Sequence, residues 1–299
     1  KIFLWALGIN EAKKTISKPS GLKEIIADKL VFSKWREGLG GELTTLVSGS
    51  AALSERLNRI FQNAGIPVLE GYGLTETSPV ISVNSFGKIK PGSVGHPLKN
   101  LSVRIQEDGE ITVKGPSVFM GYYKNEEQTK ETFTEDGYFK TGDIGHIDED
   151  GFLKITDRKK EMFKTSGGKY VAPQMIENLA KASKFIEQIM VVGDGEKMPC
   201  AIVQPDYNFA KNWATLHHLN IGETPEEISK SKELKDRIEL EIEKINKDLG
   251  NWEQIKRIEL SPELWTIEGG ELTPTLKLKR KVIKEKYLHL YNKMYGHNS

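Results

Sequence analysis

The sequence lacks most of the features that would assign it to a specialised class of protein. It has one cysteine, Cys200, in 299 residues, which excludes an intrachain disulfide and a multi-cysteine metal site. Because Cys200 lies in the apolar run PCAIVQP, we expect a buried thiol rather than a nucleophile. No apolar run approaches the roughly 18 residues of a membrane span, and the first residues show no signal-peptide pattern. We therefore expect a reducing, cytoplasmic location, with peripheral contact with a membrane left open.

The sequence also lacks an excess of charge of either sign. It contains 43 Lys+Arg and 42 Asp+Glu residues, which leave a formal net charge of +1. The composition therefore gives no electrostatic reason to expect an acidic partner, and we predict that the chain binds no nucleic acid. Hydrophobic residues make up 37% of the chain, which is enough for ordinary globular cores. The length exceeds what one compact core usually holds, so two domains are expected. The oligomeric state is left open.

An initiator methionine is lacking as well, because Lys1 opens directly into the amphipathic pattern KIFLWALGINEAKK. We therefore expect the chain to be cut from a larger protein. Further on, the short apolar run 43–47 precedes a helix predicted over 55–64, which Ser54 can cap and Gly65 can end. The strand-like IPVLEGYG follows. This strand–helix–strand order predicts a parallel α/β sheet, with ligand-binding loops at the carboxyl edge of its strands.

The rest of the chain changes character twice. Short strands with tight turns over 93–156 predict a small β-barrel or sandwich, in which Asp150-Gly151 joins IGHID and GFLKIT as a hairpin. After Lys160, helices mix with strands, and the charged run DRKKE suits a hinge. Asp206 can cap one helix, and Thr224-Pro225-Glu226-Glu227 is a capping box that opens a charged helical region. The predicted fold is α/β plus α+β. Residues 1–84 form the partial α/β part and 85–159 the β-barrel part of a large domain, and 160–299 form a small, mobile α+β domain.

Two stretches have the residue types of a nucleotide site. The hairpin brings Asp143 and Arg158 to one end, where a carboxylate and a guanidinium can both bond sugar hydroxyls; a surface ion pair is the alternative interpretation. In GYGLTETSP, the glycines beside Tyr72 allow a flat ligand to approach while the ring stacks on it. Thr75 offers a hydroxyl to a phosphate, and Glu76 offers an oxygen ligand to Mg²⁺. A plain glycine turn with a helix cap is the alternative.

Two lysine-bearing stretches are weaker signals. FKTSGGK (163–169) is similar to a phosphate-cradling loop but lacks the full GxxxxGK[ST] spacing. The basic tail LTPTLKLKRKVIKEKY (272–287) could deliver one lysine to a phosphoryl or carboxylate group. A solvated basic helix is the alternative interpretation of the tail.

Taken together, five motifs resemble the AMP-forming acyl-CoA synthetases of the adenylate-forming superfamily. In order they are SGSA, GYGLTETSP, YFKTGDIG, GFLKITDRKKEMFKTSGGKYVAP and LTPTLKLKRKV, and they cover nearly the whole chain. The lysine-rich hinge and the PTLKLKR ending are most similar to long-chain fatty-acid–CoA ligases. The resemblance implies that ATP activates a fatty acid to an acyl-adenylate, and that CoA then takes the acyl group, with release of pyrophosphate and AMP. It implies ATP and CoA as co-substrates and Mg²⁺ as cofactor.

The resemblance also implies roles for single residues. Tyr72 would stack on adenine in a pocket formed with Gly49, Ser50, Ala51, Gly71 and Gly73. Thr75 would contact the α-phosphate, Glu76 would hold Mg²⁺, and Asp143 with Arg158 would bind the ribose. Lys160 would be the pivot of the small domain, while Gly167, Gly168 and Lys169 would lie on the CoA side. Lys277 would reach the acyl carboxylate and the α-phosphate, with Lys279 and Lys281 as alternatives, because Thr275-Leu276 stands where the family commonly has Ser-Gly.

One motif of the family is lacking. The sequence contains no Ser/Thr/Gly-rich phosphate loop of the TSGTTGxPKG kind, which the family has well upstream of SGSA. We therefore expect a carboxy-terminal fragment that lacks much of the large domain and the fatty-acid tunnel, and that is inactive by itself. Two alternatives stay open: a ligase that loads a carrier-protein thiol, and a non-catalytic nucleotide-binding module. The acyl chain length cannot be read from these residues.

Overall fold

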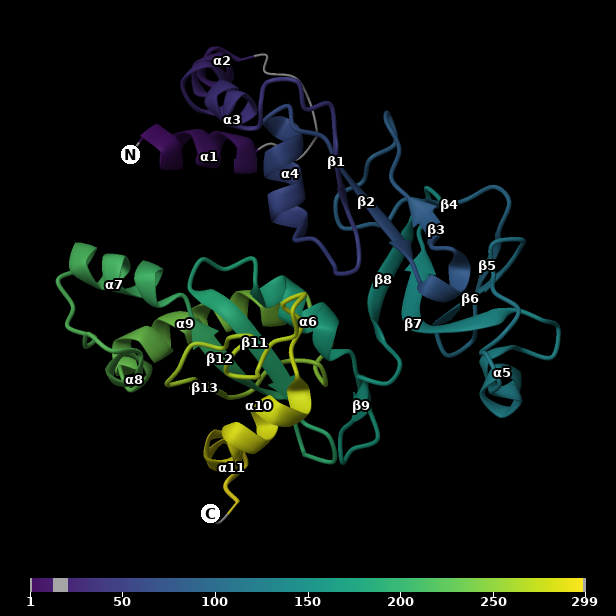
Figure 1. The fold of residues 1–299 in the computed structure, drawn as a ribbon. Coiled ribbons are helices and arrows are strands. Elements are labelled where there is room, and N and C mark those ends of the chain that lie inside the picture. The colour runs from purple at the N-terminus through teal and green to yellow at the C-terminus, as the bar shows by residue number, and fades with distance from the viewer. Residues whose placement is uncertain (1, 13–20, 298–299) are drawn as a thin grey trace. The chain divides into compact units, whose positions relative to one another are not determined.

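The structure is a computed structural model that describes residues 2–12 and 21–297 (Figure 1). The chain divides into two compact units, residues 1–156 and residues 157–299. The boundary predicted from the sequence lies three residues further on, between residues 159 and 160, within the charged run DRKKE (157–161). Within the described ranges, none of the helices combines the length and the apolar character needed to cross a membrane.

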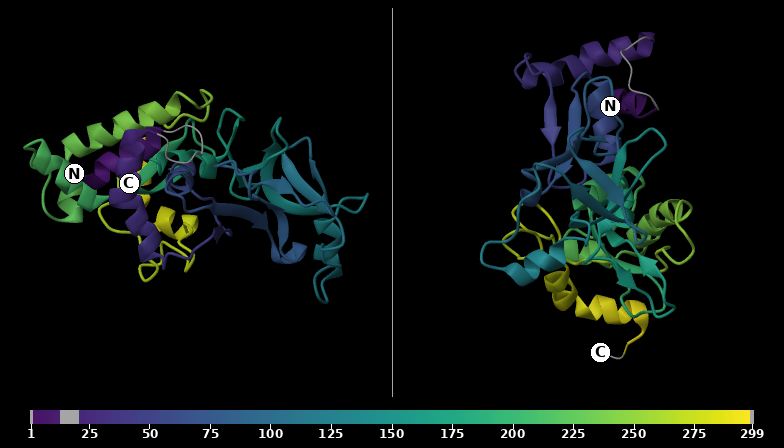
Figure 2. Two further views of the ribbon diagram at one scale, coloured as in Figure 1. Left: turned by 90° about the horizontal axis from the view of Figure 1, so that it is seen from above. Right: turned by 90° about the vertical axis from the view of Figure 1, so that its right-hand side faces the viewer.

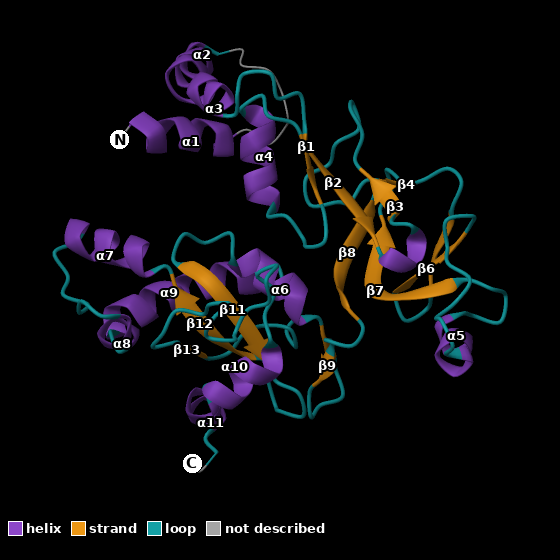
Figure 3. Cartoon of the chain, in the orientation of Figure 1, coloured by secondary structure: helices purple, strands orange, loops and turns teal. Residues whose placement is uncertain are grey.

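The first unit combines helices with two sheets (Figure 3). Its helices are α1 (Ile2–Ala12), α2 (Leu22–Ala27), α3 (Ser33–Gly38), α4 (Glu55–Asn63) and α5 (Glu126–Thr132), with a π-helical segment η1 (Asp28–Phe32) and a 3₁₀ turn η2 (Thr75–Thr77). One sheet has the order β1 (Leu46–Ser48), β2 (Val68–Gly73), β3 (Val80–Val83), β4 (His96–Pro97). The other has the order β5 (Ser102–Ile105), β6 (Glu110–Lys114), β7 (Phe139–Ile147), β8 (Leu153–Arg158), and the last residues of β8 run into the second unit.

The predicted strand–helix–strand unit is confirmed. Strands β1 and β2 pair in parallel, with Leu46 opposite Val68. Helix α4 begins after Ser54, whose hydroxyl accepts the Leu57 N–H at 3.4 Å and so satisfies one of the unpaired amides of the first turn. The helix packs against α1 and β2, and its Ile60 side chain is only 3% exposed. The arrangement leaves the loops after β1 and β2 at the same edge of the sheet.

The predicted hairpin is also present. Strands β7 and β8 are neighbours in an antiparallel sheet, and the turn between them contains Gly151 at φ +83°, a conformation that glycine adopts without strain. Leu153 of β8 exchanges backbone hydrogen bonds of 2.8–2.9 Å with Val94 and Gly95. This bonding fixes the outer edge of the hairpin to the segment before β4, so the two sheets of the first unit are joined.

The second unit is built around a three-stranded sheet. Its strands are β11 (Ile186–Val192), β12 (Cys200–Pro205) and β13 (Ile258–Leu260), of which β11 and β12 are antiparallel and β12 and β13 parallel. A small hairpin of β9 (Phe163–Lys164) and β10 (Tyr170–Val171) precedes it. The helices are α6 (Pro173–Ala180), α7 (Tyr207–Leu216), α8 (Pro225–Ser229), α9 (Lys232–Asn246), α10 (Arg280–Lys286) and α11 (Leu288–Tyr295).

Helices cover both faces of this sheet. Ile189 and Val191 lie in a cluster with helices α6 to α9, whereas Met190 and Val192 lie in a second cluster with α10 and α11. Figure 2 shows α9 and the two carboxy-terminal helices on opposite sides of the strands. Alternate side chains of a strand point to opposite faces, so a sheet buried on both sides needs continuous apolar strands. Cys200 is fully buried in the second cluster, which confirms the predicted buried thiol.

Two predicted helix starts are confirmed, and the region predicted to be helical after the second of them contains two helices. The Asp206 carboxylate accepts the Phe209 N–H at 2.9 Å at the start of α7. Thr224 and Glu227 form the predicted capping box of α8. That helix ends at Ser229, and α9 begins after a new cap at Ser231, so the predicted charged helical region is made of two helices.

Candidate functional site

Two of the predicted nucleotide-binding residues meet in the first unit. Tyr72 lies near the carboxyl end of β2, and its hydroxyl donates to Oδ2 of Asp143 on β7 at 2.7 Å. Asp143 is only 4% exposed, and its own N–H donates to the Thr141 hydroxyl at 3.1 Å. The predicted adenine-side ring and the predicted ribose-side carboxylate are therefore held in contact, although 71 residues separate them in the sequence.

The turn after Tyr72 requires glycine for steric reasons. A Cβ atom on Gly73 would lie 1.7 Å from the carbonyl oxygen of Pro79. The same carbonyl accepts hydrogen bonds from the Leu74 N–H at 2.9 Å and from the Thr77 hydroxyl at 2.6 Å. This tight turn presents Thr75 to solvent at the start of η2 and leaves Glu76 half-buried beside it.

Tyr122 holds the carboxylate of Glu76 in place. Its hydroxyl donates to Oε1 of Glu76 at 3.0 Å, while the Phe119 N–H donates to the Glu76 carbonyl at 2.8 Å. Burial and the neighbouring carboxylate raise the pKa of Tyr122 above its ordinary value, so the hydroxyl keeps its proton. This tyrosine was not among the predicted site residues, because a contact across 46 residues leaves no spacing signal in the sequence.

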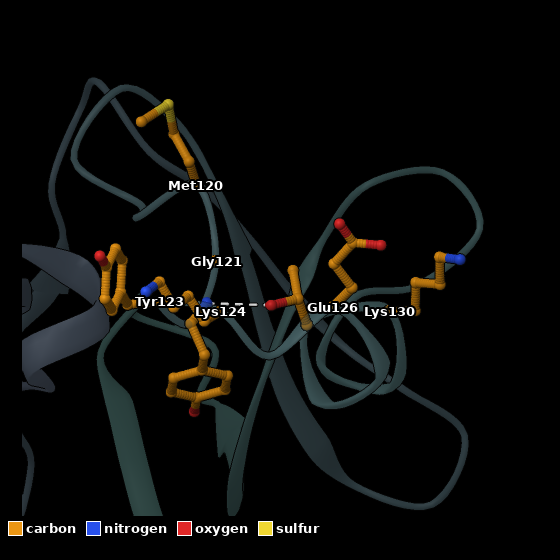
Figure 4. A pocket seen from close by; sticks show the side chains of 8 residues that line it. Met120, Gly121, Tyr123, Lys124, Glu126 and Lys130 are labelled. Carbon is orange, nitrogen blue, oxygen red and sulfur yellow. Dashed lines mark hydrogen bonds between the residues drawn. The ribbon is translucent and has the colours of Figure 1, made fainter.

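The same tyrosine belongs to a pocket of the first unit (Figure 4). The lining residues are Met120, Gly121, Tyr122, Tyr123, Lys124, Glu126, Thr129 and Lys130. The dashed line in Figure 4 is the bond from the Tyr122 N–H to the Thr129 hydroxyl, at 2.9 Å. This bond fixes the backbone from which the tyrosine reaches Glu76. The lining contains none of the residues predicted for the nucleotide.

The residues around Glu76 fit a magnesium ion that takes most of its ligands from elsewhere. Among residues 2–12 and 21–297, no group of three or more His, Cys, Asp or Glu residues gathers as a metal cage. Mg²⁺ is usually held by one or two carboxylates together with water and substrate phosphates. A single oriented carboxylate therefore suffices when ATP supplies phosphate oxygens. The metal role of Glu76 stays a prediction.

Glu70 connects two of the predicted nucleotide loops. Gly49, Ser50 and Ala51 are exposed in the loop after β1, and the Leu53 N–H at the end of this loop donates to Oε1 of Glu70 at 2.9 Å. Glu70 directly precedes Gly71 on β2 and is 4% exposed. Burial raises its pKa from 4.5 to about 7, against the opposing effect of the Leu53 N–H. A lone acid in an apolar strand offered no motif by which the sequence could have revealed it.

We expect Glu70→Gln to remove part of the pH dependence of stability. The unfolded chain releases the Glu70 proton near pH 4.5 and the folded chain near pH 7, so the folded state binds the extra proton between these values. The free energy of unfolding therefore falls as the pH rises through this window, by about 3 kcal/mol in all. Glutamine can still accept from Leu53 and does not titrate. Relative to the wild type, the free energy of unfolding of the variant should therefore rise by about 2 to 3 kcal/mol between pH 5 and pH 8.

Urea unfolding with hydrogen exchange measured on β2 peptides checks this prediction, because that signal reports the first unit alone. Glu110→Gln is a suitable control, since Glu110 is also a buried acid of the first unit. An unchanged difference between Glu70→Gln and the wild type from pH 5 to pH 8 would contradict the expected titration.

The predicted pivot lies at the start of the second unit. Arg158 ends β8, and the following turn is closed by the Glu161 N–H, which donates to the Arg158 carbonyl at 2.8 Å. Lys160 is exposed in this turn. Asp143 and Arg158 belong to different units, so the sugar clamp that the sequence suggested stays a prediction.

The second glycine turn is an ordered hairpin loop between β9 and β10. The Gly168 N–H donates to the Thr165 carbonyl at 2.8 Å, and Gly168 adopts φ +78°, where glycine is favoured. Gly167, Gly168 and Lys169 are all exposed. The Lys169 ammonium lies 5.5 Å from the centre of the Trp252 ring. The loop is therefore the turn of a two-stranded hairpin within the second unit, and its CoA-side role stays a prediction.

Lys277 lies in a closed loop of the tail. Leu272 and Leu278 form an antiparallel bridge at its base, and the Thr273 N–H donates to the Lys277 carbonyl at 2.9 Å. Leu276 has φ +60°, a left-handed conformation that favours glycine, at a position where the family commonly has that residue. Lys277 is exposed. Of the alternatives, Lys279 occupies the N-cap position of α10 without a side-chain cap bond, and Lys281 lies within the helix. The basic helix therefore begins only after the loop.

Family comparisons agree with these observations. Residues 10–123 match the AMP-binding enzyme family, and residues 161–299 match the AMP-binding enzyme C-terminal domain. The chain belongs to the AMP-binding enzymes. It is 41% identical over 275 residues to long-chain-fatty-acid–CoA ligase FadD15 of Mycobacterium bovis, covering 91% of this chain and 46% of that protein. It is 36% identical over 309 residues to long-chain-fatty-acid–CoA ligase 6 of Rattus norvegicus, covering 98% and 44%. The chain thus spans less than half the length of these relatives.

Solved structures show the same fold. The adenylation domain of a carboxylate reductase from Mycobacterium chelonae has a TM-score of 0.70 at 24% identity, covering 99% of this chain and 45% of that one. Apo MatB from Rhodopseudomonas palustris has a TM-score of 0.59 at 26% identity, covering 94% and 52%. The predicted combination of α/β and α+β parts is confirmed.

We expect Tyr72→Phe to weaken AMP binding by about 10-fold, which corresponds to about 1.4 kcal/mol. The variant keeps the ring that is predicted to stack on adenine but removes the hydroxyl that donates to the Asp143 carboxylate. Calorimetric titration of the full-length protein with AMP measures the change. Tyr123→Phe, on a side chain that is 88% exposed, is the matched control. Equal affinity of Tyr72→Phe and the wild type would show that the bond does not position the carboxylate for ligand.

Proposed function

We propose that this chain is the carboxy-terminal part of an ATP-dependent long-chain acyl-CoA ligase. The enzyme would activate a fatty acid to an acyl-adenylate with release of pyrophosphate, and would then transfer the acyl group to CoA with release of AMP. The observation that carries the proposal is the 2.7 Å bond between Tyr72 and Asp143. It unites two separate motifs in one place, and the relatives that contain the same stretch are named long-chain-fatty-acid–CoA ligases.

The residues of the first unit would bind the nucleotide. In this proposal the ring of Tyr72 stacks on adenine beside the Gly49–Ala51 loop, and Asp143 accepts hydrogen bonds from the ribose. Thr75 donates to the α-phosphate from the exposed start of η2. Glu76, oriented by Tyr122, would hold Mg²⁺, which neutralises phosphate charge when bound.

The residues of the second unit would serve the two half-reactions. A carboxylate is a poor acyl donor, and its attack on the α-phosphate gathers negative charge on the phosphate oxygens. Lys277 places a positive charge beside those oxygens. The CoA thiol then attacks the acyl carbonyl and AMP leaves. Two such steps need two arrangements of groups, and rotation of the small domain about Lys160 would provide them. The same rotation would bring Gly167, Gly168 and Lys169 to the thiol.

A substrate panel with the full-length protein tests the proposal. Fatty acids of increasing chain length are supplied with ATP and Mg²⁺, and pyrophosphate release and CoA thioester are measured separately. We expect both products with long chains, and no thioester from the 299-residue chain alone. Pyrophosphate release with thioester formed only on a carrier protein would favour the carrier-loading alternative. AMP binding without pyrophosphate release would favour a non-catalytic nucleotide-binding module.

The place of action is part of the same proposal. A long-chain fatty acid partitions into membranes, so a cytoplasmic enzyme that touches a membrane surface only peripherally would reach this substrate. Sedimentation of the full-length protein with lipid vesicles tests the surface contact.

A further inference from the structure

Three charged side chains of the second unit, Arg280, Glu177 and Glu161, form a buried to half-buried cluster that has no direct role in the proposed reaction. The Arg280 guanidinium binds both carboxylate oxygens of Glu177, at 2.8 and 2.7 Å, and its Nε donates to Oε2 of Glu161 at 2.9 Å. The Glu177 side chain is 5% exposed and the Arg280 side chain 24%. Glu177 also accepts the Val191 N–H of β11 at 2.8 Å. Through these bonds the carboxylates have charged or hydrogen-bonding partners on two separate segments, α10 and β11.

The cluster connects the two stretches whose positions matter most for the proposed reaction. Glu161 follows the predicted pivot, Lys160, and lies in the same turn. Arg280 is the first residue of α10 and comes three residues after Lys277. Gln174 of α6 completes the connection, because its side-chain amide donates to Oε2 of Glu161 at 2.6 Å. The turn of the pivot, the α6 helix and the base of the lysine loop thus share one set of bonds.

The loop that carries Lys277 is ordered internally and depends on its base for orientation. The Lys277 N–H donates to the Thr273 hydroxyl at 3.0 Å, and the Lys279 N–H donates to the Glu271 carbonyl at 2.8 Å. The tip of the loop, from Pro274 to Lys277, is exposed. A small rotation at the base would therefore move the Lys277 ammonium as part of a closed loop. Two anchors lie beside the base and resist such a rotation. The buried Glu271 carboxylate is held by Lys286 and by the Thr266 N–H, and the bidentate guanidinium of Arg280 connects the loop to α6 and to the turn of the pivot.

We propose that Arg280 is a positioning residue that fixes the Lys277 loop to the turn of the pivot through Glu177 and Glu161. The inference rests on the proposed function, in which Lys277 serves adenylation and Lys160 is the pivot. A buried ion pair adds little stability compared with apolar residues of similar volume, but its planar, two-point geometry fixes orientation. Arg280 would thus hold the lysine at one place in the small domain while that domain rotates as a whole.

The test compares Arg280→Lys, Arg280→Met and Glu161→Gln in the full-length protein. Arg280→Lys keeps the charge but loses the two-point fork, so the kcat of adenylation should fall about 10-fold, and about 100-fold in Arg280→Met. KM for ATP should change less than threefold, because Lys277 acts after ATP has bound. Thioester formation from supplied acyl-adenylate should stay within threefold of the wild type in Arg280→Lys. Glu161→Gln, which keeps the Glu177 pair, should give the smallest loss of adenylation.

A matched control separates positioning from stability. Lys293 of α11 pairs with Glu259 of β13 at 2.8 Å, in the same unit, and neither residue belongs to the lysine loop. Lys293→Met should therefore leave the adenylation kcat unchanged. Hydrogen exchange of peptides covering residues 272–279 gives a readout independent of activity. Exchange should be faster in both Arg280 variants and unchanged in Lys293→Met. If Arg280→Met does not fold, Arg280→Lys and Glu161→Gln still decide the question.

The outcomes distinguish this inference from the proposed function. Folded Arg280→Lys and Glu161→Gln proteins with wild-type adenylation, or with losses matched by Lys293→Met, would overturn the positioning role alone. An equal loss of both half-reactions in Arg280→Lys would overturn it as well, since it would indicate a general disturbance of the domain. A wild-type protein that releases no pyrophosphate with any fatty acid would instead overturn the proposed function. In that case, faster exchange of residues 272–279 in the Arg280 variants than in the wild type would still show that Arg280 anchors the loop.

Discussion

Replacing Lys277 with alanine is expected to reduce the rate of acyl-adenylate formation by about 100- to 1000-fold. In the proposed reaction its ammonium lies beside the phosphate oxygens that gain charge when the carboxylate attacks. Thioester formation from supplied acyl-adenylate should continue, because the activated carbonyl no longer needs that charge. Lys277 is exposed, so the folding of the variant should match that of the wild type. Pyrophosphate release and thioester formation, measured separately in the full-length protein, give the two rates.

The tail offers its own controls for this experiment. Lys279→Ala and Lys281→Ala remove lysines at the cap and in the first turn of α10, outside the closed loop. Both should retain most of the adenylation rate. A larger loss in either of these than in Lys277→Ala would move the catalytic assignment to that lysine. Equal loss of both half-reactions in Lys277→Ala would argue against a specific role in adenylation.

The second large effect is expected from Gly73→Ala in the first unit. The new Cβ would lie 1.7 Å from the Pro79 oxygen and 2.6 Å from the Pro79 carbonyl carbon, so the turn between β2 and β3 must open. Forcing backbone apart in a packed turn costs about 3 kcal/mol or more. Because Thr75 and Glu76 lie in this turn, we also expect AMP affinity in the full-length protein to fall by about 100-fold or more, which corresponds to about 3 kcal/mol.

Gly49→Ala is the control for this substitution. A Cβ on Gly49 would lie 3.5 Å from the carbonyl oxygen of Gly71, an ordinary contact. The free energy of unfolding of that variant should differ from that of the wild type by about 0.5 kcal/mol or less, which is usual for a surface substitution. Urea unfolding followed by hydrogen exchange on first-unit peptides compares the two variants. A Gly73→Ala protein as stable as Gly49→Ala would show that the turn can relax around the new methyl group.

Local elements were predictable because their signals are local. The helix start at Ser54, the capping box at Thr224 and the Asp-Gly turn before Phe152 each depend on bonds between residues close in sequence. The division between α8 and α9 was missed, although Ser231 is itself a good cap, because the charged pattern on either side continues without interruption. In such cases periodicity predicts helix and only the cap geometry determines where one helix ends.

Some residues of the candidate site could be predicted from the sequence, and others could not. GYGLTETSP and TGDIG carry recognisable residue types, so Tyr72, Glu76 and Asp143 could be singled out from the sequence. Glu70 and Tyr122 could not, since each is an ordinary residue whose role comes from a partner elsewhere in the first unit. The same holds for Arg280, which in the sequence is one basic residue in a lysine-rich tail.

What the sequence by itself determined is the order of the motifs, the residue types that they contain and the elements on which they lie. Hydrogen-bonded turns, caps and alternating apolar residues act over a few positions, so these features follow from neighbours in the chain. Only the tertiary structure decided which of those residues touch. The bonds from Tyr72 to Asp143 and from Arg280 to Glu161 span 71 and 119 residues. Such contacts exist because burying the sheets brings distant segments together, and no local pattern encodes that distance.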